Sequence, residues 1–131
     1  MLAWQRAIEL GVECERVAVR LPTTAAHLAS QIRRASSSIA ANIAEGNGRF
    51  SRPEYLRHLS IANGSLRELQ SHLLFIERVY LSPEATGQAL ELCELAAKLL
   101  GGLIRALRGR GKREGGNKEG GKGNGTREPG N

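Results

Sequence analysis

Arginine is the residue type in this chain best suited to bind a charged partner. The first 108 residues contain twelve arginines and one lysine against ten acidic residues. A planar guanidinium donates two parallel hydrogen bonds to a phosphate or a carboxylate. Five arginines form two groups that we take as candidate nucleic-acid contacts: Arg33 and Arg34, and then Arg49, Arg52 and Arg57. By the rise of a helix the groups are roughly 20 Å apart, which predicts a stripe or two separate patches.

Two simpler explanations of these arginines stay open. A genome rich in G and C favours arginine codons, and a solvated helix face uses arginine in ion pairs one turn apart. Few aromatic residues are available to stack on bases, since Trp4 and the two tyrosines fit the core or its rim. We therefore expect contact with phosphates rather than reading of bases.

Other chemically capable residues form no convincing catalytic or metal site. The three histidines, His27, His58 and His72, lack a second ligand at metal-binding spacing, so we expect them to be solvated or half-buried. Serines 36–38 have no base partner, and the Gly46–Gly48 segment follows a helix and lacks the lysine of a phosphate-binding loop. The sequence predicts no catalytic residue, no metal, no cofactor and no enzymatic activity.

Cys14 and Cys93 stand far apart in the sequence, each within a helical pattern, and we expect both to be small buried residues. The N-terminus shows no secretion signal, and no apolar run is long enough to span a membrane. These features predict a cytoplasmic protein with no membrane partner.

Apolar residues recur with a helical period over four segments, and no segment alternates like a strand. The first helix is expected over residues 2–20, with Trp4, Ala7 and Ile8 on its inner stripe. The second begins at residue 23 or 24, and glycines 46 and 48 predict a left-handed cap at its end.

The last two helices have clear starts. Ser51, Pro53 and Glu54 form a capping box with proline in the first turn, and residues 82–84 repeat the Ser-Pro-Glu pattern. Connections of about two to four residues force neighbouring helices to be antiparallel. The sequence thus predicts an all-α bundle of four helices in up-down-up-down order over residues 1–108.

Two regions depart from this plan. The fourth helix has two adjacent apolar stripes, which indicate a subunit interface or a deeply buried helix, and we favour the interface. Residues 109–131 hold nine of the sixteen glycines, six basic residues and no large apolar residue. We expect this segment to be a disordered basic tail.

Polar and small residues also interrupt the helical stripes. Asn42 and Asn63 lie near the expected core edge, where a hydrogen-bonded asparagine fixes the register of packed helices. Gly64 is costly inside a helix, which indicates close approach of another helix.

The combined pattern resembles a known bacterial family. The segments are LAWQRAIEL near the N-terminus, SQIRRASSSIAANIAEGNGR over residues 30–49, and YLRHLSIANGSLRELQSHL over residues 55–73. They resemble the four-helix-bundle proteins encoded in intervening sequences of 23S rRNA genes, over about residues 2–108. The residues that match the family's two motifs, beside Arg33, Arg34 and Arg49, are Asn42, Glu45, Gly46, Gly48, Asn63, Gly64, Ser65 and Glu68.

The resemblance implies a homo-oligomer, often a pentamer, with no established catalysis. A related branch comprises the accessory proteins of diversity-generating retroelements, which implies a reverse transcriptase and nucleic acid as partners. The basic tail is not part of the family pattern. We therefore expect a non-enzymatic oligomeric bundle that binds RNA or DNA through basic residues, as a candidate retroelement accessory protein. The alternative is a protein-interaction scaffold of the intervening-sequence family with no direct nucleic-acid role.

Overall fold

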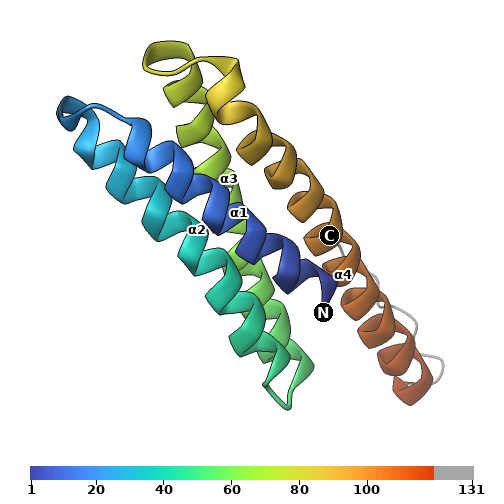
Figure 1. Cartoon of the computed structure of the whole chain (residues 1–131). Coiled ribbons are helices and arrows are strands. Elements are labelled where there is room, and N and C mark those ends of the chain that lie inside the picture. The colour runs from blue at the N-terminus through green and yellow to red at the C-terminus, as the bar shows by residue number, and fades with distance from the viewer. Residues whose placement is uncertain (120–131) are drawn as a thin grey trace.

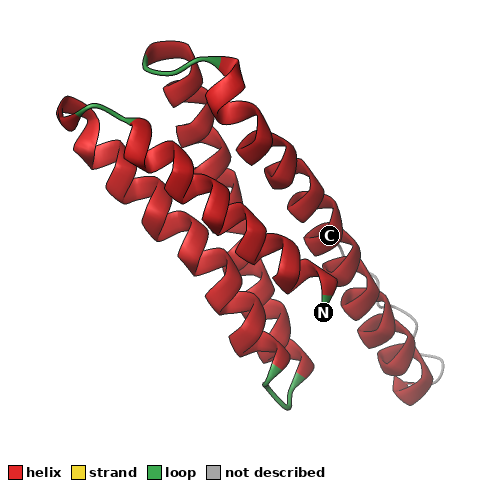
Figure 2. Cartoon of the chain, viewed as in Figure 1, coloured by secondary structure: helices red, strands yellow, loops and turns green. Residues whose placement is uncertain are grey.

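The computed structural model describes the backbone of residues 1–119 and the side chains of residues 1–110. Four long helices account for most of this part of the chain: α1 (Leu2–Arg20), α2 (Ala26–Asn47), α3 (Arg52–Val79) and α4 (Pro83–Glu119), with one short 3₁₀ turn, η1 (Thr23–Ala25). Short loops join them, and the described residues contain no strand (Figure 2). The predicted all-α bundle is confirmed.

The helices form a four-cornered bundle in which each helix contacts its two neighbours. α1 packs against α2 and α4, and α3 packs against α2 and α4. One end therefore holds the start of α1, the α2–α3 turn and the last part of α4, whereas the other end holds the α1–α2 and α3–α4 turns (Figure 1). This is the up-down-up-down order that short loops impose.

Local capping explains where α3 begins. Ser51 Oγ accepts a hydrogen bond from the Glu54 backbone N–H at 3.2 Å, and Pro53 occupies the first turn. The predicted capping of α3 by Ser51 is confirmed. The predicted left-handed cap at the end of α2 is wrong, because Gly48 has a φ of −89° in the right-handed region. The turn is closed instead by the Arg49 N–H, which donates to the Gly46 carbonyl at 3.0 Å.

The fourth helix is longer than the sequence indicates. α4 continues to Glu119, past the predicted end of the bundle at residue 108. Once a helix has nucleated, each added residue forms a further backbone hydrogen bond without needing a tertiary contact. The part of the predicted disordered tail that falls on residues 120–131 lies outside the described residues.

The core confirms the predicted apolar stripes of α2 and α3 and corrects that of α1. The inward stripes of α2 and α3 are buried as predicted, from Leu28 to Ile43 and from Leu59 to Ile76. On α1, however, Trp4 is 40% and Ile8 42% exposed. The residues of α1 that face the core are Ala3, Ala7, Leu10, Cys14, Val17 and Ala18. α1 has two apolar stripes, and the one built mostly from smaller side chains lies inside.

The wide apolar face of α4 is largely accommodated within the chain. Ala89, Cys93, Ala96, Leu100 and Leu107 are buried, and the remaining large side chains of the two stripes pack half-buried against the core. The excess apolar surface that suggested an interface on α4 is thus smaller than the sequence indicated.

Candidate nucleic-acid interface at one end of the bundle

Positive charge is concentrated at one end of the bundle. We define the basic end as residues 1–10, 39–65 and 97–110, and the opposite end as residues 11–38 and 66–96; each set is one half of the helical bundle (Figure 1). The basic end holds eight Arg and Lys residues against three Glu, whereas the opposite end holds six against seven. The net charges are +5 and −1, histidines apart.

The two predicted arginine groups fall on different ends. Arg49, Arg52 and Arg57 lie in the α2–α3 turn and the start of α3, at the basic end. Arg33 and Arg34 lie in the first half of α2, within the opposite end. The second group therefore lies around one turn, as its spacing in the sequence requires, and the structure does not join it to the first.

Arg33 already has a carboxylate partner. Its Nε and Nη2 donate to the Glu15 carboxylate of α1 at 2.8 and 2.9 Å, in a two-pronged pair. This hydrogen bonding lowers the pKa of Glu15 below its usual value, and Arg33 in turn has a raised pKa. Arg34 Nη2 donates to Gln31 Oε1 at 2.7 Å. A phosphate would have to displace Glu15 to reach Arg33, which weakens Arg33 as a contact.

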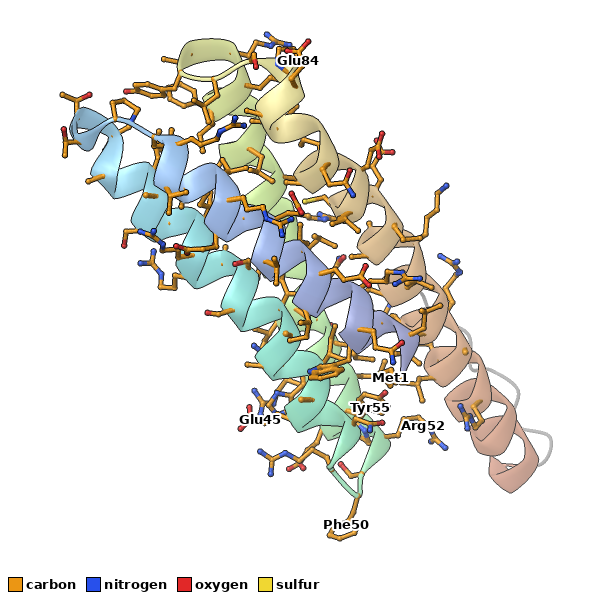
Figure 3. The ribbon with its side chains drawn as sticks, in the orientation of Figure 1. Met1, Glu45, Phe50, Arg52, Tyr55 and Glu84 are labelled. Atoms are coloured by element: carbon orange, nitrogen blue, oxygen red, sulfur yellow. The ribbon has the colours of Figure 1, made fainter. Side chains whose placement is uncertain are left out.

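Arg49 and Arg57 make longer contacts than Arg33 does, whereas Arg6, also at the basic end, pairs with Glu9 at 2.8 Å. Arg49 Nη2 lies 3.9 Å from Glu45 Oε2, and both side chains are exposed. Arg57 Nη2 lies 3.4 Å from His58 Nε2. Arg52 is half-buried at the first residue of α3. Figure 3 shows Glu45 and Arg52 on opposite sides of the α2–α3 turn, with Phe50 at its tip.

Phe50 is a residue that sequence reasoning missed. It is fully exposed and projects from the tip of the turn, away from the bundle (Figure 3). The signal was present in the sequence: Phe50 stands in a four-residue connection, between Arg49 and the Ser51 cap, and belongs to no helical stripe. A large apolar side chain in such a position has no helix face to join, so it must be exposed or bind a partner.

Gly46 allows α2 and α3 to approach closely just below this tip. A Cβ at residue 46 would lie 2.8 Å from His58 Cβ and 2.9 Å from Tyr55 Cδ1, which is closer than real contacts allow. Tyr55 Oη donates to Asn47 Oδ1 at 3.4 Å across the same junction. Any side chain at position 46 would therefore push the two helices apart and displace the turn.

A polar chain links α2 and α3 behind the turn. Asn42 Nδ2 donates to the Ser38 carbonyl at 2.9 Å, which leaves Asn42 Oδ1 as the acceptor for His58 Nδ1 at 3.0 Å. Ser38 Oγ lies 3.0 Å from Ser65 Oγ. His58 is only 5% exposed, so the prediction that it is solvated or half-buried is wrong. Burial is tolerated because Asn42 satisfies the ring nitrogen.

Comparison with known proteins places this fold in a family. A profile of the family described as 23S rRNA-intervening sequence protein matches residues 1–102. The chain belongs to this family. The resemblance drawn from the sequence motifs is confirmed at that level, whereas the link to retroelement accessory proteins stays a prediction. No curated protein matches the chain.

A solved structure of similar fold supports the assignment. It is a protein of unknown function from the S23 ribosomal protein family of Bacteroides thetaiotaomicron, 25% identical to this chain. The alignment has a TM-score of 0.72 and covers 78% of this chain and 97% of that chain.

The family-motif residues of this 23S rRNA-intervening sequence protein fall into two places. Asn42, Glu45, Gly46 and Gly48 all lie at the α2–α3 junction, where Glu45 Oε1 is 3.8 Å from His58 Nδ1. The second group, residues 63–65 and 68, lies along α3, where Ser65 bonds Ser38 and Glu68 pairs with His72 at 3.5 Å.

Within that second group, Gly64 has no close neighbour. A Cβ at position 64 would meet nothing within 4 Å, so the predicted close approach of another helix is wrong. Asn63 beside it is half-buried.

The two thiols and the acidic groups form no nucleophilic or metal-binding site among the described residues. Cys14 and Cys93 are buried and free, as predicted, and burial raises the pKa of each thiol to about 12. A neutral buried thiol is a poor nucleophile and metal ligand. Among the described residues no cluster of His, Cys, Asp or Glu could hold a metal, and no helix could cross a membrane.

Proposed function

We propose that this chain is a non-enzymatic, oligomeric helical bundle that binds nucleic acid through its basic end. The observation that carries the proposal is the separation of charge along the bundle, +5 at one end against −1 at the other. Cationic side chains gathered on one surface release the counterions condensed on a phosphate backbone, which is the main source of affinity in nonspecific binding.

The helix dipole explains part of the difference in net charge between the two ends, but not the position of Arg52. α4 has Glu84 in its first turn, which suits the helix dipole, and up to residue 110 its glutamates precede Lys98, Arg105, Arg108 and Arg110. Arg52 does not fit that explanation, because it is the first residue of α3, where the dipole favours an acidic side chain. The dipole of α3 therefore does not account for the positive charge at this position.

The proposed contacts are Arg49, Arg52 and Arg57 around the α2–α3 turn, with the cations of α4 as further candidates. Both groups belong to the same end, so one nucleic-acid strand or duplex can pass across it. Arg33 and Arg34 are secondary, since Glu15 and Gln31 engage their guanidiniums.

A salt series tests the proposal. Fluorescence anisotropy of a labelled duplex and a labelled single strand, each about 20 nucleotides long, is followed between about 50 and 300 mM salt. We expect the logarithm of the binding constant to fall linearly with the logarithm of salt, with a slope of about −3 or steeper for several phosphate contacts. Absence of binding at low salt would contradict the proposal. A binding constant that does not change with salt concentration would also contradict it.

We also propose a reverse transcriptase as a protein partner, and this part of the proposal rests on the sequence resemblance alone. Its test is co-purification with a reverse transcriptase encoded beside this gene. A gene neighbourhood within an rRNA gene, with no such enzyme encoded, would count against it.

Self-assembly, the second candidate function, is supported by a separate surface. A groove of about 550 Å³ runs between α1 and α2, and its rim includes Ile8, Gly11 and Val12. Trp4 borders a second hollow on the same seam, with Ile43 and Asn47. Exposed apolar side chains along one seam are typical of a protein-binding surface, and the proposed homopentamer would use it. Light scattering at micromolar concentration tests this, because a monomer there would contradict self-assembly.

A further inference from the structure

We infer that the basic end prefers single-stranded nucleic acid, and that one unpaired base stacks on the ring of Phe50 at the tip of the basic α2–α3 turn. This inference rests on the proposed nucleic-acid function and adds the class of ligand to it. The sequence alone favoured phosphate contact without base stacking; the exposed ring at the tip changes that expectation.

The position of Phe50 supports stacking. Its side chain is fully exposed, whereas the other phenylalanine of the chain, Phe75, is half-exposed and makes an edge-to-face contact with the Tyr80 ring at 6.4 Å. Both faces of the Phe50 ring are therefore open to a ligand. An aromatic platform beside cationic side chains is the arrangement by which single strands are bound without sequence preference, through stacking and phosphate contact together.

The turn that presents Phe50 is held in place before any ligand arrives. The Arg49 N–H bonds the Gly46 carbonyl on one side, and the Ser51 side chain caps α3 on the other. Close contact at Gly46 fixes the helices beneath. A platform that is already ordered loses little conformational entropy on binding, so more of the stacking energy contributes to affinity.

A duplex cannot use this platform in the same way. Its base faces are stacked on one another inside the helix, and Phe50 could reach them only by unstacking a step, which costs free energy. The net positive charge of the basic end attracts the phosphates of either form. Loss of the ring should therefore weaken single-strand binding selectively.

The experiment compares Phe50→Ala with Phe75→Ala, a matched control that removes the other exposed phenylalanine at the opposite end. Binding of a labelled oligo(dT) and of a labelled duplex is measured for both variants and for the unaltered chain. We expect Phe50→Ala to weaken oligo(dT) binding about ten-fold, the scale of one stacked base, and to leave duplex binding within about two-fold. Phe75→Ala should match the unaltered chain on both probes. Circular dichroism confirms that each variant is folded.

A second variant reports stacking directly. The chain has one tryptophan, Trp4, so Trp4→Phe combined with Phe50→Trp moves the only indole to the tip. Saturation with oligo(dT) should quench its emission, and saturation with duplex should leave it nearly unchanged.

The outcomes separate this inference from the function beneath it. Equal binding of oligo(dT) by Phe50→Ala and the unaltered chain, with no quenching of the relocated indole in the second variant, overturns stacking and leaves the nucleic-acid function standing. Failure of the unaltered chain to bind either probe at low salt overturns both. A change in oligomeric state in Phe50→Ala without a change in binding assigns the ring to protein contact, and this too overturns the inference.

Discussion

The two ends of the bundle are built on the same helical frame but differ in what they present. The basic end has a fully exposed phenylalanine, a net positive charge and a long Arg49–Glu45 contact of 3.9 Å between exposed side chains. At the opposite end the positive and negative charges nearly balance in number, and two arginines form ion pairs: Arg33 with Glu15, and Arg16 with Glu13. Mutual pairing satisfies charge within the chain, whereas an excess of one sign is left for a partner.

Each end also has one buried polar link between helices. Behind the α2–α3 turn, His58 and Asn42 bond each other, and Asn42 also bonds Ser38. Near the α3–α4 turn, the fully buried Thr86 donates to Glu77 Oε2 at 2.7 Å. Each link joins one buried and one half-buried side chain: buried His58 to half-buried Asn42, and buried Thr86 to half-buried Glu77. The two links differ in the group that is buried, a histidine ring at the basic end and a threonine hydroxyl at the opposite end.

The largest expected effect comes from removing charge at one end only. The triple variant Arg49→Gln, Arg52→Gln and Arg57→Gln should weaken nucleic-acid binding about ten- to a hundred-fold at low salt and flatten the salt slope by about 3. The matched variant Arg16→Gln, Arg33→Gln and Arg34→Gln removes the same charge from the opposite end. It should change binding by less than about three-fold, as measured by anisotropy. Equal losses in the two variants would show that only net charge matters and would remove the distinction between the ends.

A smaller effect is expected from glycine replacement. Gly46→Ala should lower the free energy of unfolding by about 1–3 kcal/mol, because its methyl group would overlap His58 and Tyr55. Gly64→Ala and Gly87→Ala place the methyl in open space and should raise stability by up to about 1 kcal/mol. Urea denaturation measures all three. If Gly46→Ala left the free energy of unfolding unchanged, the α2–α3 junction would have to accommodate the added methyl group at little cost.

The smallest difference is expected between the two polar links. Asn42→Leu leaves the buried His58 Nδ1 without its acceptor and should cost about 1–3 kcal/mol. Thr86→Val keeps the shape of the side chain, and the half-buried Glu77 can turn to water, so the cost should stay below about 1 kcal/mol. Thermal unfolding followed by circular dichroism compares them. A larger loss of stability in Thr86→Val than in Asn42→Leu would contradict this prediction.

Some of the candidate site could be predicted because it depends on local sequence. The Ser51 cap and the proline after it determine where α3 starts, and the short connection then places Arg49, Arg52 and Arg57 around one turn. Phe50 could have been included on the same grounds, since it lies in that connection. The burial of His58 could not, because it depends on Asn42, sixteen residues earlier, facing it from another helix.

The sequence by itself determined the four helices, their antiparallel order and the inner faces of α2 and α3. Those features follow from apolar period, caps and loop length, which act over a few residues. Only the tertiary structure decided which stripe of α1 faces the core, why Gly46 is needed while Gly64 is not, and that Arg33 is held by Glu15. It also decided that cations from three separate helices gather at one end. Each of these depends on how helices distant in sequence are rotated and packed against one another, and no local pattern encodes that rotation.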